Sequence, residues 1–153
     1  MTASGRSRIQ IFTIGFTKRT ATEFFGELER ARIEHLVDVR LSNTSQLAGY
    51  TKRGDLEFFL ERVGGISYRH EPLLSPTREL FDDRKRRRVG WQEFEKRFRR
   101  LMVERRVEDR IDPSWFRGRT VLLCSEASAD ECHRSIVADY LANAWGGTEV
   151  THL

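Results

Sequence analysis

Short apolar runs alternate along the chain with segments whose apolar residues recur every three or four positions. The runs, rich in β-branched side chains, predict strands over residues 9–14, 36–39, 66–70, 120–124 and 149–152. The periodic segments predict amphipathic helices over residues 20–31, 56–63, 91–107 and 132–145. Such alternation is typical of an α/β fold, with a mostly parallel five-stranded sheet that has helices on both faces.

Two connections in this pattern are long for a chain of 153 residues. Residues 41–51 are rich in Ser, Asn, Thr and Gly, and residues 73–90 hold Pro76 and a run of basic side chains. Loops of this length in a small domain often act as lids or binding elements. The chain length predicts a single α/β domain over residues 9–153, preceded by a flexible N-terminus at residues 1–8.

The composition, 39% hydrophobic and 33% charged residues, predicts a soluble globular protein. No stretch is apolar enough for a membrane span or a signal peptide, so we expect a cytoplasmic protein with no membrane partner. Two cysteines, Cys124 and Cys132, are too few for a disulfide scaffold and are expected as reduced thiols. Cys132, at a predicted helix start, is expected to be the more reactive.

The net charge of +4 is distributed unevenly. Residues 84–110 hold twelve basic and five acidic side chains and carry +7, which leaves −3 for the remainder. This asymmetry favours nucleic acid or a nucleotide as partner, although a basic surface also serves solubility alone. The nucleic-acid-binding candidates are Arg84, Lys85, Arg86, Arg87, Arg88, Lys96 and Arg100.

Ligands of parallel sheets bind beyond the carboxyl ends of the strands, so the residues there are candidates for chemistry. Thr13 and Gly15 end the first predicted strand, where a tight turn precedes a helix N-terminus that favours anions. Asp38 and Arg40 share one face of the second strand, as a structural ion pair or as part of a site. Tyr68, on the third strand, can donate or accept a proton.

The strongest group surrounds the end of the fourth predicted strand. Cys124 and Glu126 come directly after that strand's apolar residues, and Cys132 and His133 open the next helix. A helix start stabilises an anion or a thiolate, and the guanidinium of Arg134 suits a carboxylate or phosphate. Two buried structural cysteines are the alternative. A zinc site lacks a fourth ligand and needs adjacent Cys and His ligands, so we expect no metal and no cofactor.

These motifs together resemble the family called domain of unknown function 488. They are Thr13-Ile-Gly15, Leu36-Val-Asp38-Val-Arg40, Gly65-Ile-Ser-Tyr68, Leu122-Leu-Cys124-Ser-Glu126, Cys132-His-Arg-Ser135 and Val150-Thr-His152. The resemblance covers nearly the whole chain and implies a compact α/β fold, but no reaction. It assigns site roles to Thr13, Gly15, Asp38, Arg40, Tyr68, Cys124, Glu126, Cys132, His133 and Arg134.

The chain departs from the family pattern where Phe16 and Thr17 replace the usual His and Ser, and where Leu41 replaces a Pro. It also resembles, in part, rhodaneses and small phosphatases, in which a cysteine precedes a short anion-binding loop closed by an arginine. Here Cys124 and Arg134 lie ten positions apart, with no glycine between them.

Three functions follow. The favoured one is an enzyme, a hydrolase or transferase, that acts on nucleic acid or a nucleotide with Glu126 or Asp38 as acid or base and Arg134 as anion clamp. The alternatives are a non-catalytic nucleic-acid-binding module that uses residues 84–110, and a rhodanese- or phosphatase-like enzyme with Cys124 or Cys132 as nucleophile. The catalytic candidates are Asp38, Tyr68, Glu126, Cys132 and His133. The substrate-binding candidates are Thr13, Gly15, Arg40, Cys124, Arg134 and Ser135. The oligomeric state stays open.

Overall fold

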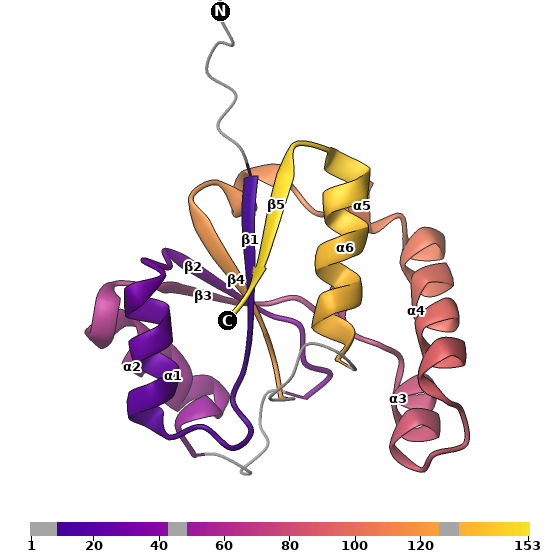
Figure 1. Ribbon diagram of the computed structural model, residues 1–153, viewed down its shortest axis with the longest axis horizontal. Helices are drawn as coiled ribbons and strands as arrows, with labels where there is room; N and C mark the ends of the chain where they lie inside the picture. Colours follow the sequence, from indigo (N-terminus) through magenta and orange to yellow (C-terminus); the bar gives the residue numbers. More distant parts are fainter. Residues whose placement is uncertain (1–8, 43–48, 126–131) are drawn as a thin grey trace, which may run out of the picture.

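All five strands of the structure lie parallel in one sheet (Figure 1). The structure is a computed structural model that describes residues 9–42, 49–125 and 132–153. The predicted flexible N-terminus and Glu126 lie outside the described residues. The strand order is β3-β2-β4-β1-β5. The strands are β1 (Ile9–Gly15), β2 (His35–Asp38), β3 (Ser67–His70), β4 (Arg119–Cys124) and β5 (Thr148–His152).

Helices cover both faces of this sheet, as the alternation of elements predicted. Figure 1 shows α1 (Ala21–Arg30) and α2 (Arg53–Gly64) on one side, and α3 (Arg78–Lys85), α4 (Trp91–Arg105) and α6 (His133–Trp145) on the other. A short helix, α5 (Val107–Arg110), follows α4, and single 3₁₀ turns occupy Gly49–Thr51, Pro72–Leu74 and Pro113–Phe116. Among these helices none has both the length and the apolar character needed to cross a membrane.

Strand side chains divide between the two cores with a period of two, because neighbours on a strand point to opposite faces. On β4, Leu122 and Cys124 pack with α4 and α6, whereas Val121 and Leu123 pack with α1 and α2. Buried on both faces, β4 reads as a continuous apolar run. That continuity is why its sequence predicts a central strand so clearly.

The prediction of a long loop over residues 73–90 is wrong, because α3 lies within it. The Thr77 hydroxyl accepts a hydrogen bond from the Leu80 amide and caps the N-terminus of α3. Of the α3 side chains only Leu80 is fully buried, and Phe81 is half-buried. A helix that buries so little leaves too sparse an apolar pattern to be recognised from sequence.

The strand order places a change of direction next to β4. Connections from β1 to β2 and from β2 to β3 run through α1 and α2, whereas those entering and leaving β4 run through α4 and α6. The chain therefore leaves the carboxyl ends of the neighbouring strands β2 and β4 toward opposite faces. Ligands of open α/β sheets bind at such points.

Candidate functional site

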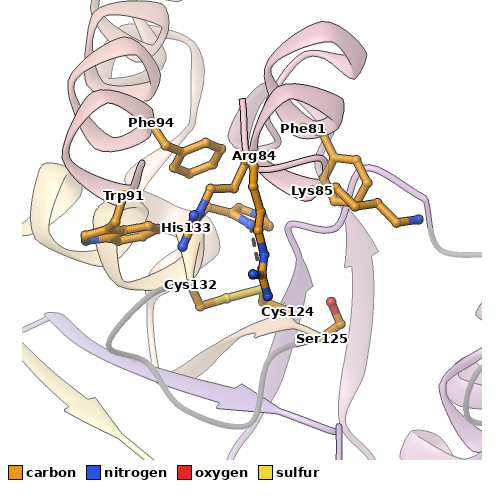
Figure 2. Close-up of a pocket in the computed structure, with 10 residues that line it drawn as sticks. Phe81, Arg84, Lys85, Trp91, Phe94, Cys124, Ser125, Cys132 and His133 are labelled. Carbon is orange, nitrogen blue, oxygen red and sulfur yellow. Dashed lines mark hydrogen bonds between the residues drawn. A yellow bond between two sulfur atoms is a disulfide. The ribbon is translucent and has the colours of Figure 1, made fainter. Parts of the chain in front are cut away.

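Two adjoining cavities lie at the carboxyl end of β4, with volumes of about 440 Å³ and about 310 Å³. Both are lined by Phe81, Lys85, Ser125 and His133. Figure 2 shows the larger cavity, in which basic and aromatic side chains of α3 and α4 face the two cysteines. The smaller cavity extends toward the loop after β2, where Arg40 lines it.

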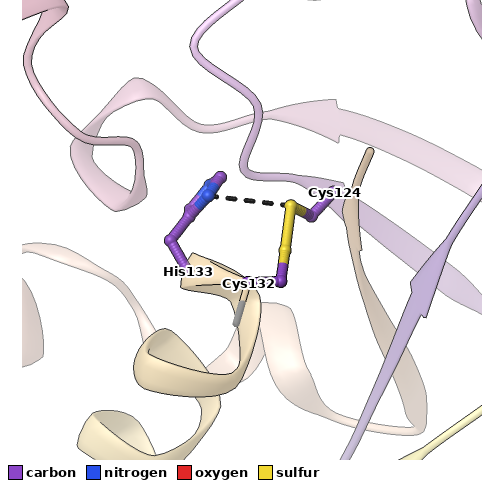
Figure 3. Close-up of side chains that lie close together, drawn as sticks. All are labelled: Cys124, Cys132 and His133. Atoms are coloured by element: carbon purple, nitrogen blue, oxygen red, sulfur yellow. Dashed lines mark hydrogen bonds between the residues drawn. A yellow bond between two sulfur atoms is a disulfide. The ribbon is translucent and has the colours of Figure 1, made fainter. Parts of the chain in front are cut away.

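The expectation of reduced thiols is corrected by the structure, in which a disulfide joins Cys124 and Cys132 (Figure 3). Cys124 ends β4, and Cys132 is the residue before the first turn of α6. The two are eight positions apart in sequence, and the disulfide links the end of β4 to the start of α6. We call Cys124 and Cys132 the cysteine pair. While the disulfide joins them, neither has a free thiol, so the predicted ranking of their thiol reactivity does not apply to this form.

His133 is held in one orientation by contacts on both ring nitrogens. Its Nε2 lies 2.7 Å from the carbonyl oxygen of Val39, which can only accept, so Nε2 carries the proton and donates. Its Nδ1 is consequently unprotonated and lies 3.6 Å from Sγ of Cys124. Burial lowers the pKa of His133 to about 4, the charge of Arg134 acts in the same direction, and the ring is neutral near pH 7.

The buried Asp38 and Arg40 form a cluster with the half-buried Tyr68 beside the smaller cavity. The Arg40 guanidinium donates to both carboxylate oxygens of Asp38, from Nε at 2.9 Å and from Nη2 at 2.8 Å. The Tyr68 hydroxyl donates to the same carboxylate at 2.6 Å. Both oxygens of this carboxylate are occupied by donors, so its role in this geometry is to orient Arg40.

Arg40 has unused hydrogen-bonding capacity inside this cluster. Its Nη2 also donates to the carbonyl of Thr51 at 2.7 Å, and its side chain is only 5% exposed. Its Nη1 is buried and has no hydrogen-bond partner among the described residues. Because a buried unpaired donor is costly, an anionic ligand oxygen in the smaller cavity would complete the site.

Several predicted site residues do not line these cavities. Thr13 is buried and hydrogen-bonds to His152 of β5, 2.6 Å away. The Ser135 hydroxyl donates to the Cys132 carbonyl at 2.7 Å, which secures the first turn of α6. Arg134 is fully buried in α6 and lines neither cavity. Gly15 is closer to the site, because its register partner on β4 is Cys124.

The predicted basic residues do not all line one cavity. Arg84, Lys85 and Arg87 line the larger cavity, whereas Arg100 lines a separate cavity of about 150 Å³. Arg88 is paired with Asp83 at 3.2 Å. Arg86 and Lys96 are exposed. Part of the charge of +7 is also balanced by acidic residues outside the segment, because Arg97 pairs with Asp83 and Arg99 with Asp139.

Sequence reasoning missed the aromatic side of the site. Trp91 stacks on Phe94 with ring centroids 5.5 Å apart, and Phe94 stacks on Phe98 at 5.9 Å. Their helical spacing identifies a core stripe, which is correct for Phe94 and Phe98. Trp91, however, is only partly buried and lines the larger cavity. Its place at the first position of α4, beside the basic run, is the one signal that could have marked it.

The family model described as Domain of unknown function DUF488 matches residues 20–141, which include β2, β3, β4 and the start of α6. No curated protein matches the chain. No solved structure matches it either.

Proposed function

The chain belongs to the family Domain of unknown function DUF488, and because that description names no reaction, we propose a function from the site itself. The protein is an enzyme that acts on a nucleotide or on the phosphate-bearing end of a nucleic acid. The observation that supports this most directly is the partly unsatisfied, buried guanidinium of Arg40 in a cavity that adjoins an aromatic and basic one. These cavities are within the size range of small-molecule sites, about 300 to 1,000 Å³.

The smaller cavity suits the phosphate. Arg40 is oriented in advance by Asp38, and Arg78 and Lys85 line the same cavity. A fixed guanidinium fork binds phosphate oxygens through charge-assisted hydrogen bonds, and little side-chain entropy is lost on binding. Arg40 thus takes the anion-binding role that the sequence assigned to Arg134.

The larger cavity suits a base. Trp91 and Phe94 form a stacked aromatic pair, and the guanidinium carbon of Arg84 lies 5.8 Å from the Trp91 ring centroid. Stacking of one base on an aromatic side chain contributes about 1 to 3 kcal/mol. His133 and Ser125 line both cavities, so a substrate that spans them would place its reacting atoms near the neutral imidazole.

Thiol chemistry is the second candidate, favoured by the contact between Nδ1 of His133 and Sγ of Cys124 at 3.6 Å. After reduction of the disulfide, an unprotonated Nδ1 at this position could accept the thiol proton and generate a nucleophilic thiolate. Substrates tested on reduced and oxidised protein separate the two candidates, because only this second one requires the reduced cysteine pair.

Nucleotide binding, followed by calorimetry with AMP and ATP, tests the first candidate. We expect Trp91→Leu to weaken binding about 5- to 150-fold, which corresponds to the stacking contribution. Arg40→Lys keeps a charge but loses the fork and should weaken binding at least about 10-fold. Matched controls are Trp115→Leu and Arg30→Lys, neither of which lines a cavity described above.

The proposal is overturned if both site variants bind the nucleotides as tightly as the wild type does. It is also overturned if the wild type binds neither nucleotide. Trp91 is not part of the buried core, so the Trp91 variant keeps the test valid if Arg40→Lys unfolds. Chromatographic analysis of nucleotides incubated with the wild type then tests turnover. Unchanged nucleotides under all conditions would reduce the function to binding.

A further inference from the structure

We propose that Cys124, Cys132 and His133, with the disulfide reduced, form a binding site for a thiophilic divalent metal ion, Zn²⁺ in particular. The two thiolate sulfurs and Nδ1 of the imidazole are the ligands, and the fourth coordination position opens into the larger cavity. This inference goes beyond the proposed function and does not depend on nucleotide binding.

The ligand atoms are already close together. The sulfurs and one imidazole nitrogen lie within 4.8 Å of one another (Figure 3). In a tetrahedral zinc site, metal–sulfur distances of about 2.3 Å and metal–nitrogen distances of about 2.0 Å place ligand atoms roughly 3.5 to 3.8 Å apart. The Cα atoms of the cysteine pair are 7.3 Å apart. That spacing exceeds the usual disulfide span of about 4.4 to 6.8 Å, so the backbone has room for the sulfurs to separate around an ion.

The surroundings of His133 are those of a metal-binding histidine. Such residues characteristically donate their other ring N–H to a backbone carbonyl or a carboxylate, which fixes the tautomer and the ring orientation. Here Nε2 donates to the Val39 carbonyl at 2.7 Å, and Nδ1 faces the sulfur of Cys124. The ring also packs edge-on against Phe98, with centroids 5.7 Å apart. These contacts aim the Nδ1 lone pair at the point where the ion would bind.

Two thiolates and one imidazole form a set that selects a thiophilic metal over Mg²⁺ or Ca²⁺. Three protein ligands with an open position are typical of catalytic rather than structural zinc. All three line the larger cavity together with Arg84, Lys85 and Arg87. Because the thiolates neutralise the charge of the ion, the positive charge of these basic side chains would draw an anion toward the open position.

The disulfide and the metal exclude each other. Reduction by a phosphine or a dithiol supplies two electrons that break the S–S bond, and each thiol releases its proton as its sulfur binds the ion. Re-oxidation by a low-molecular-weight disulfide transfers two electrons from the cysteine pair to that disulfide, which is reduced to two thiols, while the S–S bond forms and the metal is released. The same preparation can therefore be measured in its reduced and oxidised forms, and the oxidised form serves as the control.

Titration of the full chain with Co²⁺, followed by displacement with Zn²⁺, tests the site in the absence of nucleotide. For the reduced, metal-stripped protein we expect about one ion per chain, with the intense visible bands of tetrahedral cobalt and a thiolate-to-cobalt charge-transfer band. The oxidised protein should show neither band. Cys132→Ser and His133→Gln should each weaken Zn²⁺ binding at least about 10-fold, because each removes a ligand and even the loss of an outer-shell partner of a metal site costs about 10- to 100-fold.

The matched control is His35→Gln, at the start of β2, where the histidine contacts Ser67 and not the cysteine pair. It should bind cobalt as the wild type does. Octahedral cobalt spectra, no binding by the reduced wild type, or equal binding by the oxidised protein would each overturn the proposal. Should a variant lose its circular dichroism spectrum, the comparison of reduced with oxidised wild type decides alone. Failure here leaves nucleotide binding untouched, and failure of nucleotide binding leaves this site untouched.

Discussion

Replacing Asp38 by Asn removes the charge that faces the buried guanidinium of Arg40. The Asp38 and Arg40 side chains are 0% and 5% exposed, so water cannot compensate for the loss. Asn retains one acceptor oxygen, but its amide nitrogen would replace either Oδ1, opposite Nε of Arg40, or Oδ2, opposite Nη2 of Arg40 and the Tyr68 hydroxyl, donor against donor. Removal of one partner of a buried pair costs about 3 to 5 kcal/mol, and we expect the free energy of unfolding to fall by that amount.

Urea unfolding at pH 7, followed by tryptophan fluorescence and far-ultraviolet circular dichroism, measures the effect. The matched control is Arg88→Ala, which breaks a surface pair with Asp83 in which the Arg88 side chain is 56% exposed. Exposed pairs contribute about 0 to 1 kcal/mol. The double variant Asp38→Leu with Arg40→Met removes both charges and should recover more than half of the loss. A loss for Asp38→Asn no larger than for Arg88→Ala would refute the argument.

Three further predictions concern pH, salt and thiol labelling. Lowering the pH from 7 toward 4.5 should reduce the free energy of unfolding by up to about 3 kcal/mol through His133. The reason is that the unfolded chain takes up a proton near a pKa of 6.5, whereas the folded protein does so only near a pKa of about 4. An equal loss in the His133→Gln variant would contradict this. If the chain binds duplex DNA, neutralising the exposed Arg86 and Arg87 should lower the slope of log K against log salt concentration by up to about 0.9 each. The Arg88→Ala variant should lower the slope less, because Arg88 is already paired with Asp83. Equal slopes for all variants would exclude a phosphate contact. The cysteine pair should react with iodoacetamide only after reduction, and labelling of the untreated protein, followed by mass spectrometry, would contradict the disulfide.

Periodicity was sufficient for the elements that bury a continuous stripe or run. The β4 strand and the α4 helix are fully supported by their own side chains, so their sequences predict them within a few residues. The α3 helix depends on one buried leucine and a threonine cap. The many charged residues around them hide this weak apolar pattern in the sequence. Its position over the strand ends is a tertiary property, set by the packing of Leu80 against the α4 and α6 core.

For the site, residue types at strand ends predicted the Asp38–Arg40 pair and the neighbourhood of Cys124 with His133. Whether each of these side chains faces a cavity or the protein core was not predictable. Arg134 and Arg40 are both buried arginines next to strand or helix ends, yet only Arg40 lines a cavity. Whether Arg134 faces the core or a cavity depends on which face of α6 packs against the sheet. A shift of one residue along the helix would turn a different face toward the sheet. Likewise, the disulfide depends on where the start of α6 lies relative to the end of β4, which spacing alone does not specify.

The strand ends around the cavities are tied together mainly by hydrogen bonds to backbone carbonyls. The Thr17 amide and hydroxyl both donate to the carbonyl of Ser125, which joins the loops after β1 and β4. His133 donates to the Val39 carbonyl, and His70 donates to the Arg40 carbonyl at 2.8 Å, which joins the start of α6 and the end of β3 to the end of β2. Such cross-links hold the ligand-facing groups in place before any ligand binds, so binding energy is not spent on ordering them. The element that covers this edge, α3, is attached by few buried contacts, and motion that admits a substrate is therefore expected there rather than at the strand ends.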